Sequence, residues 1–125
     1  MECAKCSSVE TKPRIVYACS GCADVGELAD QVSRKLRKDG FATPKSSCLA
    51  GIGAGLKSFI DAAADARSIL TIDGCSVSCA KLVIEKAGLT PLSVILTDMG
   101  VEKGNTAVTP ELTAQLSQTI VKRFS

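Results

Sequence analysis

Short runs of apolar, β-forming residues alternate in this chain with segments whose apolar residues recur at helical spacing. The runs at 14–18, 68–72 and 91–97 are predicted strands, and a glycine follows each within a few residues. Strands that alternate with helices form parallel sheets through right-handed crossovers. The pattern predicts an α/β fold: a three-layer sandwich with a mostly parallel sheet of about four strands and helices on both faces.

The helices are predicted from their caps and apolar spacing. Asp24 is interpreted as an N-cap with Glu27 as its capping-box partner, and Gly40 ends that helix. The remaining helices are expected over 56–63, over 80–86 with Gly88 as its stop, and from Thr109-Pro110 onward.

The run at 42–48 is the weakest strand candidate. It contains Pro44 and two serines, so it is expected to be short and to lie at a sheet edge. No linker or internal repeat interrupts the pattern. The chain of 125 residues is therefore expected to hold one α/β domain, 13–125, preceded by a polar, cysteine-containing tail, 1–12.

The chain contains no histidine. This absence excludes Ser-His-Asp triads, Cys-His pairs and HExxH zinc sites. Any bound metal must be held by sulfur, with help from oxygen or backbone groups. Enzymatic activity is left open, and a non-enzymatic role is the stronger expectation.

Composition also argues against some classes of binding partner. A net charge of +2 and 3% aromatic residues argue against a nucleic-acid partner. No apolar run reaches the roughly 20 residues of a membrane helix, and the start lacks the layout of a signal peptide. The expected compartment is the cytoplasm, where seven cysteines indicate metal or redox chemistry rather than disulfides. A protein partner cannot be named from the sequence.

Five of the seven cysteines follow predicted strands. Ligands bind beyond the carboxyl ends of the strands in an open parallel sheet, so these thiols are expected to converge there. The alternative is that they are small buried hydrophobic residues. By segment, they are Cys19 and Cys22 after 14–18, Cys48 after 42–48, and Cys75 and Cys79 after 68–72.

The stretch from Asp73 to Cys79 places two thiols where a strand gives way to a helix. Gly74 permits a tight turn, Cys75 precedes the helix, and Cys79 lies in its first turn, where unpaired amides favour thiolate. Cys19 and Cys48 could complete a tetrahedral Cys₄ site of the kind that Zn²⁺ prefers. Lysines expected to offset its negative charge are Lys45, Lys57 and Lys81.

Other uses of the thiols remain open. Cys3-x₂-Cys6 together with Cys19-x₂-Cys22 has zinc-ribbon spacing. Alternatively, Cys19 and Cys22 could form a thiol-disulfide redox pair, with another cysteine as the resolving thiol. Cu(I), an iron–sulfur cluster or arsenite could replace Zn²⁺ in a Cys₄ site.

Two further features give weaker indications. The glycines at 51–55 resemble a phosphate loop, but Leu56 separates the last glycine from Lys57, so they are read as positions of close backbone approach. Asp98 ends a predicted strand and is expected to be a base, a turn residue or a neighbour of the ligands. Asp73 and Gly74 are likewise expected beside the ligands.

Several blocks resemble the DGC-domain proteins, which are small prokaryotic proteins described as zinc-binding. The resemblance covers about 14–105 and is most specific in CLAGIG (48–53) and DGC (73–75), supported by TDMG (97–100). It implies that four characteristic cysteines, here Cys19, Cys48, Cys75 and Cys79, bind zinc. Cys3, Cys6 and Cys22 fall outside that pattern. The resemblance names no substrate or partner. A metal site at the ligand-binding edge of a domain large enough to fold without metal indicates a role in sensing, carrying or sequestering the ion.

Overall fold

The computed structural model describes residues 12–125. Within this range, β1 (Arg14–Ala18), β2 (Ser68–Asp73) and β3 (Leu92–Ile95) form one parallel sheet in the order β1-β2-β3. The predicted strands at 14–18, 68–72 and 91–97 are therefore confirmed, although the last is shorter than expected. A 3₁₀ turn, η1 (Leu96–Met99), follows β3 directly.

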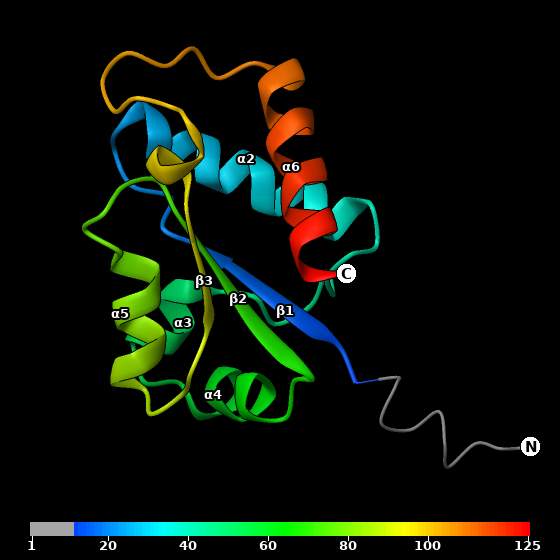
Figure 1. The fold of residues 1–125 in the computed structure, drawn as a ribbon. Helices are drawn as coiled ribbons and strands as arrows, with labels where there is room; N and C mark the ends of the chain where they lie inside the picture. Colours follow the sequence, from blue (N-terminus) through cyan, green and yellow to red (C-terminus); the bar gives the residue numbers. More distant parts are fainter. Residues whose placement is uncertain (1–11) are drawn as a thin grey trace, which may run out of the picture.

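Helices cover both faces of the sheet, as Figure 1 shows. The first face is covered by α2 (Asp24–Lys38) and α6 (Pro110–Phe124). The second is covered by α3 (Leu49–Gly53), α4 (Lys57–Ala64) and α5 (Cys79–Lys86). This three-layer arrangement confirms the predicted α/β sandwich, with three strands in the described residues rather than about four.

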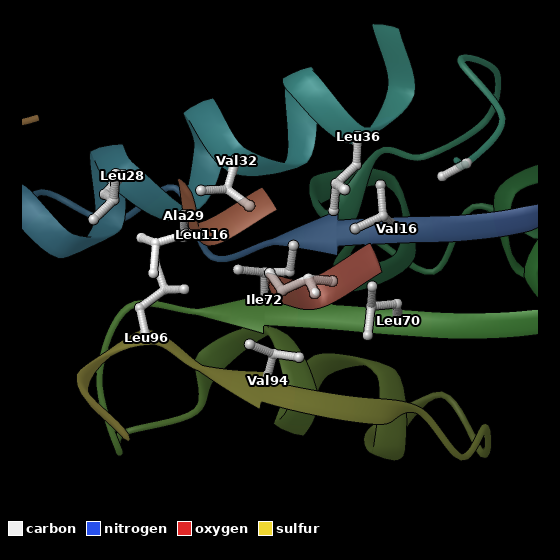
Figure 2. Packing of buried hydrophobic residues seen from close by; sticks show 12 residues of the cluster. Val16, Leu28, Ala29, Val32, Leu36, Leu70, Ile72, Val94, Leu96 and Leu116 are labelled. Carbon is white, nitrogen blue, oxygen red and sulfur yellow. The ribbon is translucent and has the colours of Figure 1, made fainter. Parts of the chain in front are cut away.

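The larger apolar cluster fills the space between the sheet and the α2–α6 layer. Figure 2 shows side chains of all three strands directed toward α2, with Val16 and Leu70 opposite Leu36. Both strand residues are fully buried, because α2 and α6 cover this face of the sheet. The second cluster, which includes Ile15, Ile69 and Ile84, lies under α3, α4 and α5.

Several helix ends lie where the sequence predicts them. The hydroxyl of Thr109 accepts a hydrogen bond from the Leu112 amide (3.1 Å), and Pro110 opens α6. Gly40 and Gly88 follow the ends of α2 and α5 with φ of +85° and +86°. Glycine adopts this left-handed conformation without the steric penalty that other residues carry.

The predicted capping box at the start of α2 is wrong. Ala23 is the N-cap, and Asp24 is the first helical residue. The Asp24 carboxylate accepts a hydrogen bond from the adjacent Val25 amide (2.8 Å) and reaches a distant loop, described below. Glu27 is exposed on the helix surface.

The predicted edge strand at 42–48 is also wrong, since this segment consists of bends. The Thr43 amide donates one hydrogen bond to the Arg14 carbonyl at the edge of β1 (2.9 Å). Pro44 then provides no amide donor, and Ser46 has a φ of +64°, so the extended pairing cannot continue.

The glycines at 51–55 lie in and after a short helix, α3, that the sequence reading missed. A Cβ atom added to Gly51 would lie 2.7 Å from the Phe59 ring of α4. The expectation of close backbone approach is therefore confirmed at Gly51, where α3 packs against α4.

Candidate functional site

Asp73 ends β2 and fastens the start of α5. Its buried carboxylate accepts hydrogen bonds from the Ala80 amide (2.7 Å) and the Lys81 amide (3.1 Å). Burial raises the pKa of Asp73, and these two amides act in the opposite direction. The carboxylate satisfies first-turn donors that Ser78, the N-cap residue, leaves without a side-chain partner. Asp73 thereby positions the helix that begins at Cys79.

Gly74 brings the same turn against the start of α2. A Cβ atom added here would lie 2.5 Å from the Val25 carbonyl oxygen, so a larger residue would force the backbone apart. Its carbonyl accepts a hydrogen bond from the Thr97 amide after β3 (3.2 Å). Its amide donates to the Cys19 sulfur after β1 (3.4 Å). Gly74 therefore ties together the carboxyl ends of all three strands.

Cys19 and Cys48 line one open cavity of about 460 Å³. Cys19 extends the β1–β2 pairing by one residue, because its amide donates to the Ile72 carbonyl (3.1 Å). Cys48 is the exposed N-cap residue of α3. Burial, and then the charge of Cys48, raise the pKa of Tyr17 to about 12. The Tyr17 hydroxyl is buried and has no hydrogen-bond partner within residues 12–125.

Cys75 and Cys79 lie on the turn after β2 and at the first residue of α5. Lys103 Nζ donates to the Cys75 sulfur (3.5 Å), so a cation already faces this thiol. The sequence reading named other lysines for this purpose. Of those, Lys57 instead pairs with Asp61 (2.7 Å) on the surface of α4.

The loop that carries Lys103 is held by Asp24. The Asp24 carboxylate accepts hydrogen bonds from the Gly104 amide and the Thr106 amide, both at 2.9 Å. These bonds lower the pKa of Asp24. The sequence reading missed this loop because its turn-forming residues, 102–106, carry no periodic pattern. Such long-range contacts have no local signature.

The described thiols are all at least partly exposed, although Cys19 also packs against the larger apolar cluster. Cys19 and Cys75 are partly exposed, and Cys22, Cys48 and Cys79 are exposed, all as free cysteines. The interpretation that these five are buried hydrophobic residues is therefore wrong. Asp98 is exposed in η1, and its expected role beside the ligands stays a prediction. Cys3 and Cys6, with most of the tail at 1–12, lie outside the described residues.

The four predicted ligands are brought near one edge without forming a closed site. In the described part of the chain, no three Cys, Asp or Glu side chains are grouped closely enough to hold a metal ion. Cys19 is the common member, since its sulfur contacts the turn that carries Cys75 and it shares a cavity with Cys48. The ligand assignment stays a prediction.

A membrane-crossing helix is also absent from residues 12–125: none there is long and apolar enough.

Comparison with known proteins identifies the family. The chain is 36% identical over 90 residues to the anaerobic and virulence modulator AnvM of Pseudomonas aeruginosa, an alignment that covers 71% of this chain and 67% of AnvM. No solved structure matches. The sequence model of the DGC domain matches residues 15–122, which reach from β1 to α6. This chain therefore belongs to the DGC domain family.

Proposed function

We propose that this protein binds one soft metal ion, most readily Zn²⁺, through the thiolates of Cys19, Cys48, Cys75 and Cys79. The observation that carries the proposal is the contact between the Gly74 amide and the Cys19 sulfur. It joins the cysteine after β1 to the turn that carries Cys75 and Cys79. Since the chain has no histidine, thiolates are the donors that suit such an ion.

The donor chemistry fits a soft ion, and the separation of the thiols indicates how binding would act. Cys75 now faces Lys103, and Cys48 faces the cavity, so ion binding must draw these side chains together. Gly74, Asp73 and Asp24 hold the backbone from which they would move. A site that closes only on its ligand suits sensing or carrying an ion. The name of AnvM, an anaerobic and virulence modulator, supports a regulatory role, which we place in the cytoplasm as part of this proposal.

A thiol-disulfide role is the second candidate. Cys19 and Cys22 are both free, and Cys22 is exposed just before α2. An accessible thiol beside a helix start can exchange with disulfides. This role predicts a reversible Cys19–Cys22 disulfide and measurable disulfide-reducing activity, which the Cys22→Ser variant would lose.

The metal proposal is tested on protein purified anaerobically, reduced and freed of metal. Zinc added in competition with a chromophoric chelator should bind at one ion per chain, with the stoichiometry confirmed by native mass spectrometry. Cys75→Ser and Cys48→Ser should lose most of this binding, and Cys22→Ser is the matched control that should keep it. Parallel titrations with Cu(I) and arsenite, and elemental analysis for iron and sulfide on the anaerobically purified protein before its metal is removed, identify the preferred ion.

The N-terminal pair distinguishes the remaining alternative. The double variant Cys3→Ser with Cys6→Ser should still bind about one ion per chain. If that variant loses zinc while Cys48→Ser retains it, the zinc-ribbon set Cys3, Cys6, Cys19 and Cys22 holds the ion instead.

A further inference from the structure

The cavity that Cys19 and Cys48 share is also lined by two arginines of α2. Arg34 and Arg37 lie one turn apart on that helix and face the same space of about 460 Å³. Ser20, Ser33 and Ser47 add hydroxyl groups to the lining. The cavity therefore combines cationic groups, hydroxyl groups and two sulfur nucleophiles at the carboxyl end of β1.

The lining carries an excess of positive charge. Asp30 is its one carboxylate, and it already accepts from Arg34 Nε (2.8 Å) and the Ser20 hydroxyl (3.2 Å). Arg37 has no carboxylate partner in the described residues, and its Nη1 donates to the Val16 carbonyl (3.3 Å). A guanidinium has five N–H donors, so most of those on Arg37 remain available to a ligand.

The surroundings of Arg37 favour an anion. Burial, and then the neighbouring Arg34, lower the pKa of Arg37, while Asp30 acts in the opposite direction. The Asp30 carboxylate is already bonded to Arg34 Nε, so the Arg37 guanidinium keeps donors for a further anion. Charge-assisted hydrogen bonds from a guanidinium to a carboxylate are among the stronger polar contacts in proteins. An anionic ligand would supply the missing partner and would then lie beside Cys48.

We propose that this cavity recognises an anionic low-molecular-weight disulfide and that Cys48 exchanges with it. A ligand carboxylate binds Arg37, which places a ligand sulfur near the Cys48 thiolate. The thiolate attacks that sulfur, a Cys48–ligand S–S bond forms, and the ligand's own S–S bond breaks. The other half leaves as a thiolate with the bonding electron pair. No metal or further oxidant takes part.

Exposure and position distinguish Cys48 from the other described thiols. Cys19 lines the same cavity, but it is only partly exposed and its sulfur already accepts from the Gly74 amide. Cys22 and Cys79 do not line this cavity, so Arg34 and Arg37 cannot orient a ligand toward them. Cys75 has a cation nearby, but its partner is Lys103 on another loop. Removing an arginine charge should therefore change the reaction at Cys48 and leave the reactions at Cys75 and Cys79 as they were.

The test uses reduced, metal-free, full-length protein and two disulfide probes. Glutathione disulfide is anionic, and cystamine is cationic. After timed exposure, free thiols are alkylated, and peptide mass spectrometry measures the modified fraction of each cysteine. Cys48 should react faster with glutathione disulfide than with cystamine, and added salt should reduce this preference.

Matched variants assign the preference to the cavity. Arg37→Gln should slow glutathione disulfide at Cys48 about tenfold, because charge-assisted hydrogen bonds exceed that factor in binding. Lys38→Gln removes the same charge from the next residue of α2, outside the cavity, and should leave the rate unchanged. Arg37→Lys should restore part of the rate. If Arg37→Gln does not fold, Arg34→Gln and Arg37→Lys decide the question.

Equal rates with both probes, or equal slowing by Arg37→Gln and Lys38→Gln, would overturn the proposal. So would modification confined to Cys22 or Cys79. Zinc titration of Arg37→Gln separates this proposal from the metal site, because both use Cys48. The variant should bind zinc normally, so failure of either proposal leaves the other standing.

Discussion

The interior of the sandwich and the carboxyl edge of its sheet are held together by different interactions. The two clusters on either side of the sheet consist of apolar side chains, most of them aliphatic and fully buried. At the edge, backbone amides instead donate to side-chain acceptors: Asp73, Cys19 and Asp24. Burial of apolar side chains supplies most of the favourable free energy of folding. Each hydrogen bond at the edge adds little to that free energy, but it fixes the orientation of its partners.

The interior clusters stabilise the fold, whereas the carboxyl edge of the sheet carries the thiols that could bind a ligand. The apolar clusters include no cysteine among their fully buried members, although Cys19 packs against the larger one. We therefore expect the fold to persist when no metal is bound to the thiols. Substitutions in the interior and at the carboxyl edge of the sheet should therefore have separable effects on stability and on metal binding.

A substitution in the interior is expected to cause the largest loss in the free energy of unfolding. Leu70→Ala removes a fully buried side chain from the central strand, and such changes typically reduce the free energy of unfolding by about 2–5 kcal/mol. Urea denaturation measures the loss. Leu82→Ala changes the same residue type at an exposed position of α5 and should shift stability by less than about 0.5 kcal/mol. The folded fraction of Leu70→Ala should still bind one zinc ion.

Removing the metal should affect the edge more than the interior. We expect chelated, reduced protein to keep its α/β circular dichroism and a cooperative melt. Its midpoint should fall, since a ligand present at about one hundred times its Kd adds about 2.7 kcal/mol to stability. On chelation, the rate of amide hydrogen exchange should increase more in residues 48–53 and 73–79 than in β3.

Complete unfolding of the chain on chelation would contradict this comparison. The metal would then supply the folding free energy, as it does in small zinc modules, and a sensing or carrying role would lose its main support.

The same division explains what the sequence could predict. Periodicity identified β1, β2 and β3 because apolar burial leaves a repeating pattern in the residues. The edge contacts have no such pattern. The hydrogen bonds from Gly104 and Thr106 to Asp24 join residues about eighty positions apart, so Asp24 was mistaken for a local cap.

The candidate site shows the same limit. The order of strands predicted that the cysteines approach one edge, and the contact of Cys19 with Gly74 agrees with it. The placement of Lys103 beside Cys75 and of Arg37 in the Cys48 cavity depends on loop conformation and on the rotation of α2 about its axis. Neither can be derived from spacing along the chain.

Asp73→Ala should reduce the free energy of unfolding by less than Leu70→Ala does, and the structural change should be concentrated at the start of α5. It leaves the buried Ala80 amide without its acceptor, which typically costs about 1–3 kcal/mol. Zinc affinity should fall as well, because α5 begins at Cys79. Asp98→Ala removes an exposed carboxylate of η1 as the control, and its stability should change by less than about 0.5 kcal/mol. Equal losses in both variants would show that Asp73 does not position α5.

Asp24→Asn is expected to cause the smallest loss in the free energy of unfolding. This loss can be recognised because it varies with pH. Hydrogen bonds from Gly104, Thr106 and Val25 lower the pKa of Asp24 in the folded protein, so its contribution to stability is present above the unfolded value of about 3.9. That contribution is lost as the pH falls through the folded value. The stability difference between wild type and Asp24→Asn should therefore be largest near pH 7 and shrink in acid.

Urea denaturation at several pH values measures this difference. Asp98→Asn, which removes an exposed carboxylate of η1, is the matched control and should show no comparable trend. Faster hydrogen exchange at 102–106 in Asp24→Asn would locate the change in the loop that places Lys103 beside Cys75. A stability difference that does not vary with pH would mean that the Asp24 carboxylate does not hold this loop, and the edge would then need another source of order.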